Sequence, residues 1–244
     1  MAFAWPDGKR AAVSLSYDDA RPSQVDVGVP ILDAHGVRAT FYVSPRRLGE
    51  RLDSWRAAVA AGHEIGNHTV SHPCSGNFAF SRGNALEDYT LERIEAELLD
   101  ANAAIEQALG VTPATFAYPC GQKFVGRDGG VRSYVPLVSD LFVVGRGAGD
   151  ESANDPVTCD LAQAMGMGTD DQPFDVLRPL IDHAAEEGSW LLLLGHDIGG
   201  GGHQVAHADA LDALCRYCSD PARGIWLDTV AAVGTHIRDN RSQE

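Results

Sequence analysis

Long apolar runs are absent from this 244-residue chain, and no window approaches the roughly 18 consecutive apolar residues of a membrane-spanning helix. A secretory signal peptide is not expected either, because the opening "MAFAWPDGKRAAVSLSYDD" runs directly into an expected strand. We therefore expect no membrane partner and a cytoplasmic location for the chain as given. A secreted protein trimmed of its leader would have the same sequence.

Basic residues are scarce, with 19 Lys and Arg against 34 Asp and Glu, so the formal net charge is −15. A negative surface of this size repels nucleic acid and anionic membranes at long range. Nucleic acid is therefore not an expected partner, and neutral or cationic partners are favoured.

A disulfide framework is not indicated, because the five cysteines are odd in number and lack framework spacing: Cys74, Cys120, Cys159, Cys215 and Cys218. This pattern suits a reducing compartment. Cys215 and Cys218 form a C-x-x-C within "ALCRYC", which one face of an amphipathic helix explains better than a zinc or redox site.

Short β-rich runs alternate with helical patterns from end to end. The expected strands are 11–17, 39–44, 63–67, 114–119, 141–145 and 190–196. The expected helices are 27–36, 52–62, 91–110 and 174–188, and Gly36, Gly62 and Gly110 end the first three. The alternation predicts a parallel sheet with helices outside it, in one α/β domain over residues 1–244. Segment 120–172 is loop-rich.

Polar residues follow the expected strands: Asp18 and Asp19, Asn67 and His68, Tyr118 and Pro119, and Gly195 to Asp197. In a parallel barrel all strand C-termini open on one face, and that face carries the active site. These side chains are therefore expected to converge.

A metal site explains the paired carboxylates and the nearby histidines. His68 and His72 lie at i, i+4, so one helical turn after the strand would aim both imidazoles the same way. Asp18 and Asp19 would raise each other's pKa unless a cation lies beside them. One carboxylate can bind the metal, and the other becomes a candidate general base. Two His and one Asp leave positions open, as in catalytic zinc sites; Co, Ni or Mn are alternatives.

Three further histidines follow the last apolar run. His196, after the apolar run "LLLL", is the best placed general acid, although a strand-end histidine bonded to a loop carbonyl is the alternative. His203 and His207 form a second H-x-x-x-H, which surface histidines at a helix start explain more simply than a metal site. Gly199 to Gly202 lack the Lys-[ST] of a phosphate loop.

Three segments resemble the motifs of a known family. "SYDDA", "HTVSH" and "LLLLGH" resemble the T-F-D-D-G, H-[ST]-x-x-H and L-x-L-H motifs of the polysaccharide deacetylases, the NodB-homology group or carbohydrate esterase family four. "GIWLDTVAAVGTHI" resembles the closing helix of many members. The resemblance implies a deformed (β/α) barrel and one divalent metal ion. By motif, Asp18 is the base, Asp19, His68 and His72 bind the metal, and His196 is the acid.

The chain departs from the family pattern at three motifs. "AYPC" stands where R-x-P-Y is usual, with Ala117 in place of the Arg that supports the base and Cys120 in place of the Tyr whose backbone N–H stabilises the oxyanion. Ala20 replaces the glycine of the first motif. The fourth motif has no clear counterpart, so the partner of His196 stays open among Asp160, Asp170 and Asp171.

The missing arginine leads to a separate hypothesis. "LFVVGRGAGD" reads as a later barrel strand that delivers Arg146 to the face that carries Asp18, so Arg146 would replace the family's Arg from a different strand. The alternative is a loop arginine that pairs with Asp150 or Glu151.

The resemblance implies a hydrolase that removes N- or O-linked acetyl groups from a carbohydrate such as a chitin-like glycan, peptidoglycan or xylan. A related amidohydrolase of a small non-sugar amide is the second hypothesis, and a non-catalytic glycan-binding or regulatory relative is the third. Exposed aromatic side chains on the loops would favour polymer binding. The sequence does not determine the acyl group, the glycan, the native metal or the oligomeric state.

Overall fold

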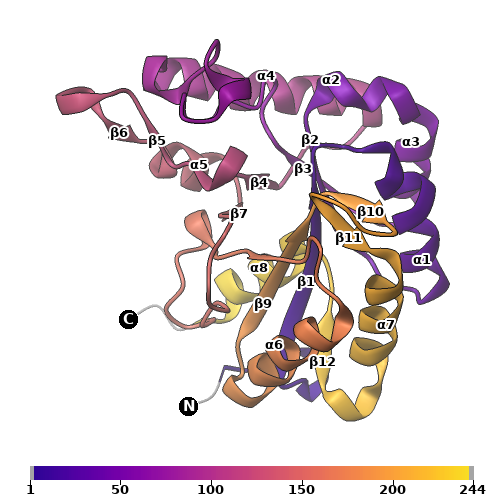
Figure 1. Cartoon of the computed structure of the whole chain (residues 1–244). Helices are drawn as coiled ribbons and strands as arrows, with labels where there is room; N and C mark the ends of the chain where they lie inside the picture. Colours follow the sequence, from indigo (N-terminus) through magenta and orange to yellow (C-terminus); the bar gives the residue numbers. More distant parts are fainter. Residues whose placement is uncertain (1–2, 242–244) are drawn as a thin grey trace.

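Eight parallel strands build the main sheet of the protein, whose computed structural model describes residues 3–241. The strands lie in the order β7-β4-β3-β2-β1-β9-β8, with β12 also paired to β1. Their bounds are β1 Ala11–Asp18, β2 Thr40–Val43, β3 Glu64–Asn67, β4 Thr115–Ala117, β7 Val144–Arg146, β8 Met167–Gly168, β9 Trp190–Gly195 and β12 Ile225–Leu227. The sheet curls into a half-barrel, and Figure 1 shows the longer helices outside it.

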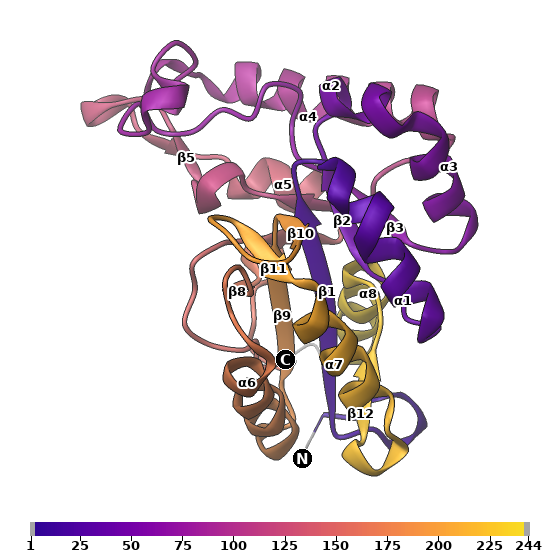
Figure 2. The ribbon, with the colours of Figure 1, turned by 45° about the vertical axis from the view of Figure 1, so that its right-hand side comes forward.

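The helices follow the strands in the expected alternation. Their bounds are α1 Val29–Ala34, α2 Pro45–Leu48, α3 Leu52–Ala60, α4 Leu91–Leu109, α5 Val135–Leu141, α6 Phe174–Glu187, α7 Ala208–Ser219 and α8 Val230–Asn240. Two small strand pairs lie outside the main sheet: β5 Phe124–Val125 with β6 Arg132–Ser133, and β10 Asp197–Gly199 with β11 Val205–His207. Figure 2 shows the second pair beyond the C-terminal end of β9. Within the described residues, no helix is long and apolar enough to cross a membrane.

The core lies on both faces of β1 and β9, and every residue of these two strands is buried. Leu15 and Leu193 pack in one apolar cluster with Ile181 of α6 and Leu214 of α7. Strands covered on both faces read as near-continuous apolar runs rather than as alternating patterns. The sequence pattern therefore predicted the parallel sheet correctly, and each of the six expected strands overlaps a strand of the sheet. The expected strand 141–145 begins too early, because Leu141 ends α5 and β7 begins at Val144, and β8 and β12 were not predicted.

Helix ends also match the sequence pattern. Gly36, Gly62 and Gly110 have φ of 63°, 91° and 73°, the left-handed conformation that glycine adopts without strain. The first helix differs from its expected range 27–36, because a π-helical turn over Gln24–Gly28 precedes α1. Within the loop-rich segment 120–172, the helix α5 was not predicted.

Candidate active site

The end of β1 brings two consecutive carboxylates to one cavity. Asp18 is the last residue of the strand, and Asp19 follows with a left-handed φ of 79°. Successive side chains of a regular strand point to opposite faces, so this change of backbone conformation allows both carboxylates to line the same cavity. Ala20 is also left-handed, with φ of 52°, which explains why glycine suits this motif position.

His68 and His72 approach each other through a loop after β3, with 4.7 Å between their ring centroids. The expected helical turn was wrong, because Thr69 and His72 have φ of 61° and 52°. Side chains hold the loop instead. Asn67 Oδ1 accepts from the Thr69 N–H at 2.7 Å, and Thr69 Oγ1 accepts from the His72 N–H at 2.9 Å. The two imidazoles converge as expected, by a different local structure.

Asp19, His68 and His72 form a donor set that fits a divalent ion. Asp19 Oδ1 lies 3.9 Å from His68 Nε2 and 3.7 Å from His72 Nε2. Ligand atoms about 2.1 Å from a tetrahedral zinc ion lie about 3.4 Å apart, so a small adjustment would complete the site. His68 Nδ1 donates to the Ala117 carbonyl at 2.8 Å, which leaves Nε2 as the donor atom toward a metal.

The electrostatics of these groups suit metal binding. Burial and the neighbouring His68 lower the pKa of His72 to about 4. Burial alone would raise the pKa of Asp19, but the histidines and Arg21 outweigh it and lower that pKa to about 2. A neutral imidazole and an ionised carboxylate are the forms that bind a metal ion.

Arg21 is a site residue that the sequence reasoning missed. Its guanidinium donates to Asp19 Oδ2 at 3.0 Å, to Asp197 Oδ2 at 2.7 Å and to Gln204 Oε1 at 2.8 Å. These contacts leave Asp19 Oδ1 directed toward the histidines. The sequence feature that could have identified Arg21 is its position two residues after Asp19.

Arg146 ends β7 and is fully buried beside Asp18. Its Nη2 donates to Asp18 Oδ1, and its Nη1 donates to the Gly147 carbonyl at 2.9 Å. The structure thus brings the two residues together as the sequence predicted. Asp150 instead accepts from the Gly166 N–H at 2.8 Å. Burial would raise the pKa of Asp18, but the charges of Arg146 and two histidines outweigh it and hold that pKa below its ordinary value.

His196 follows β9 and is held by Asp170, one of the three carboxylates left open by the sequence. Asp170 accepts from the His196 backbone N–H at 3.0 Å and contacts Nδ1 at 2.5 Å. Burial would lower the pKa of His196, but the bond to Asp170 and the nearby Asp18 outweigh it and raise that pKa. Asp160 instead caps the Ala162 N–H at 2.9 Å.

The candidate ligands, base and acid line one cavity of about 680 Å³. Its walls include Asp18, Asp19, His68, His72, His196 and Cys120, so the residues of the first, second, third and last motifs meet there. Arg146 is not part of the cavity wall, and it contacts the site through its hydrogen bond to Asp18. His207 lies apart from this ligand set and contacts Asp171 at 3.2 Å, and Cys215 and Cys218 are buried on α7, as expected for a helix face.

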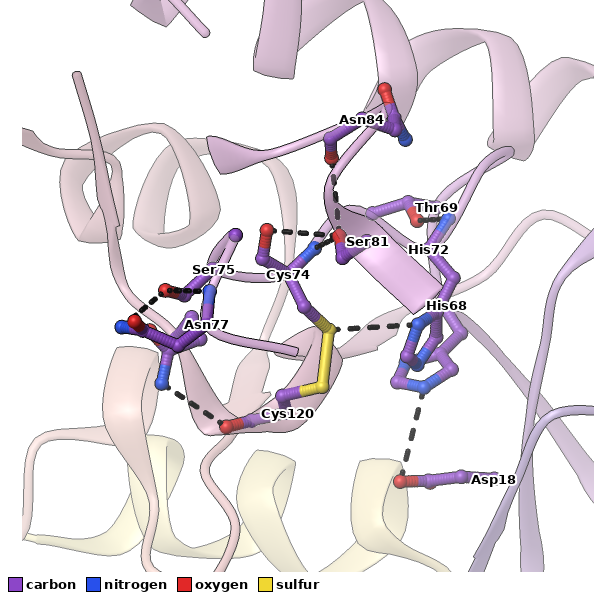
Figure 3. Close-up of a disulfide and its surroundings, with 12 residues drawn as sticks. Asp18, His68, Thr69, His72, Cys74, Ser75, Asn77, Ser81, Asn84 and Cys120 are labelled. Carbon is purple, nitrogen blue, oxygen red and sulfur yellow. Dashed lines mark hydrogen bonds and ion pairs between the residues drawn. A yellow bond between two sulfur atoms is a disulfide. The ribbon is translucent and has the colours of Figure 1, made fainter. Parts of the chain in front are cut away.

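A disulfide joins Cys74 to Cys120 beside the site, and the sequence did not predict it. Figure 3 shows the two imidazoles between this bridge and Asp18; the Cys74 Sγ lies 3.7 Å from His72 Nδ1. The partners are 46 residues apart, and the loops after β3 and β4 bring them together. One bridge is not a disulfide framework. Because two of the cysteines are bonded, however, the cysteine pattern no longer supports a reducing compartment.

Replacing both bridge cysteines by serine is expected to lower the free energy of unfolding by about 2–4 kcal/mol, because the unfolded chain regains the entropy of an open loop. Denaturant unfolding under non-reducing conditions measures this change. Cys159→Ser is the matched control, because Cys159 is unpaired, and its effect is expected to stay within about 0.5 kcal/mol. Equal stability of the double variant and the wild type would contradict the prediction.

Known proteins with similar sequences indicate the family that the motifs resemble. A family model described as polysaccharide deacetylase matches residues 6–127. Chitin deacetylase 1 of Cryptococcus neoformans is 35% identical over 107 residues, which are 44% of this chain and 20% of that protein. The chain spans between 5% and 40% of the length of eight curated relatives that it matches.

Solved structures share the fold. A structure from Mycobacterium smegmatis with the same family description has a TM-score of 0.71 at 17% identity, and the match covers 100% of this chain and 96% of that one. A family 4 acetyl xylan esterase from Clostridium thermocellum, in complex with a cobalt ion, has a TM-score of 0.59 at 22% identity over 92% of this chain and 90% of that one. At these identities the likeness shows the deformed barrel fold alone.

Proposed function

Because this chain belongs to the polysaccharide deacetylase family, we propose that it is a metal-dependent hydrolase that removes N- or O-linked acetyl groups from a carbohydrate. One observation carries the proposal. A single cavity holds the possible ligand set Asp19, His68 and His72 together with two separately supported titratable groups, Asp18 and His196.

A divalent ion held by Asp19, His68 and His72, most simply zinc, would polarise the acetyl carbonyl and lower the pKa of a water molecule. The chain's own residues supply the proton transfers. Asp18 is held at Oδ1 by Arg146, while its Oδ2 lies 3.9 Å from His68 Nε2. In the proposed mechanism Asp18 Oδ2 accepts the proton of the attacking water as general base.

His196 is the proposed general acid. Asp170 engages its Nδ1, so Nε2 is left to face a ligand in the cavity that His196 lines. The raised pKa favours the protonated imidazole, which donates to the leaving nitrogen or oxygen of the sugar. The backbone N–H of Cys120, on the same cavity wall, is proposed to stabilise the oxyanion.

Exposed aromatic side chains favour a carbohydrate over a small amide as substrate. Phe78 and Phe80 line the cavity and are 41% and 69% exposed. Large apolar groups that stay exposed at a cavity mark a binding surface, and sugar rings present apolar faces to such rings.

Acetate release from acetylated xylan, chitooligosaccharides and small acetyl amides tests the proposal, after metal removal and reconstitution with Zn, Co, Ni or Mn. We expect about one equivalent of metal in the active protein, and the stripped protein should lose at least about 10²-fold in activity. Full activity without metal would refute the metal-dependent mechanism. Turnover of small amides alone would move the assignment to an amidohydrolase.

A further inference from the structure

We infer that Arg46 and Arg47 bind an anionic group of the substrate, so that the enzyme acts on an acetylated glycan that carries carboxylates. This inference rests on the proposed function, since it names the substrate class of the same cavity. The anion would belong to a sugar next to the acetylated one.

Arg46 and Arg47 lie in α2, the short helix that directly follows β2. Figure 1 shows α2 beyond the end of β2. Both arginines are exposed and line the cavity that contains Asp19 and His68. They therefore approach a bound ligand from the strand next to β1, at the carboxyl end of the sheet.

Neither guanidinium has an ion-pair or hydrogen-bond partner among residues 3–241. Arginines in this chain meet carboxylates easily, because 34 acidic residues outnumber 19 basic ones. Arg21, the third arginine of the cavity wall, pairs with Asp19 and Asp197, and the buried Arg146 pairs with Asp18. Arg46 and Arg47 thus add two unbalanced positive charges to the cavity, against the sign of the whole molecule. The net charge favoured neutral or cationic partners, but the local charge of the cavity favours an anion.

Two aromatic rings of the cavity wall, Phe78 and Phe80, offer a stacking surface for the acetylated sugar. The ring centroids of Phe78 and Phe80 are 5.5 Å apart, and that of Phe80 lies 6.2 Å from the ring of His72. A sugar stacked on Phe80 would therefore lie beside a proposed metal ligand. A guanidinium forms paired hydrogen bonds with a carboxylate, so either Arg46 or Arg47 of the cavity wall can hold an acidic sugar in a fixed register.

The test compares two oligosaccharides of equal length and acetylation, one neutral and one with a carboxylate on the neighbouring sugar, by equilibrium binding and by acetate release. We expect the wild type to bind the acidic ligand about 10-fold more tightly at low ionic strength, and added salt should remove this preference. Arg46→Gln with Arg47→Gln should abolish the preference and leave binding of the neutral ligand unchanged within about two-fold.

Arg178→Gln with Arg132→Gln is the matched control, because it removes two exposed positive charges from α6 and β6 that have no ion-pair partner among residues 3–241 and lie outside the cavity wall. It should keep the preference. A sulfated oligosaccharide forms a third arm, and tighter binding of sulfate than of carboxylate would overturn the assignment to carboxylates.

The two proposals fail in different ways. Equal affinity for the acidic and neutral ligands, or no binding of the acidic one, would overturn the inference even if acetate is released from both. An arginine-dependent preference without acetate release would support the anion site and refute the proposed hydrolysis.

Discussion

Asp18→Asn is expected to lower kcat by at least about 10²-fold while the protein still binds about one equivalent of metal. The structure separates the roles of the adjacent carboxylates. Asp19 Oδ1 faces both imidazoles, whereas Asp18 Oδ1 is engaged by Arg146 and only its Oδ2 approaches His68. The amide keeps the shape of the side chain but is a far weaker base. Metal analysis and steady-state kinetics of the purified variant measure the two effects.

Asp19→Ala is the paired variant, and it should lose metal as well as turnover. Thermal unfolding of both variants shows whether either has lost its fold, because the amide at position 18 leaves the buried Arg146 without its counter-charge. Equal metal loss in the two variants would contradict the division of roles.

Arg146→Ala should lower kcat by about 10²-fold or more without loss of metal, because Arg146 is fully buried and holds the base in its charged form. The variant should also raise the pKa of Asp18, so the acidic limb of the rate profile should move to higher pH. Removing one partner of a buried pair costs about 3–5 kcal/mol, so lower stability is expected too.

Arg146→Lys separates orientation from folding, because it keeps the charge but not the planar fork. It should restore most of the stability and only part of the turnover. Arg127→Ala is the matched control, since Arg127 pairs with Asp88 on the surface, far less buried than Arg146. Wild-type kcat and an unchanged pH profile in a folded Arg146→Ala protein would show that another group supports Asp18.

The sequence predicted the sheet and the convergence of the site, because both depend on patterns within single segments. The buried runs of β1 and β9 are legible as apolar stretches, and the polar residues that follow them mark the strand ends. Arg146 could be predicted for the same reason, because it ends a strand. The catalytic roles of these residues stay predictions.

Features that depend on loop conformation or on long-range pairing were not predictable. The left-handed Thr69 and His72 rule out the helical turn that the i, i+4 spacing suggested. The side chains of Asn67 and Thr69 stabilise a different turn, which has no periodic sequence pattern. The choice of Asp170 over its neighbours depends on the loop between β8 and α6. The bridge between Cys74 and Cys120 depends on two separate loops meeting.

The pairing of β4 with β7 has an evolutionary consequence. Ala117 and Arg146 are register partners in this pairing, and both are fully buried. Register partners on parallel strands lie about 4.8 Å apart with side chains on the same face, so either position can deliver one guanidinium to the same space. Arginines at both positions would overfill one buried space. The absence of an arginine from both positions would leave Asp18 without a counter-charge. The two positions should therefore covary across relatives, with an arginine at one accompanied by a small residue at the other, and lineages should exchange the arginine between strands by coupled substitutions.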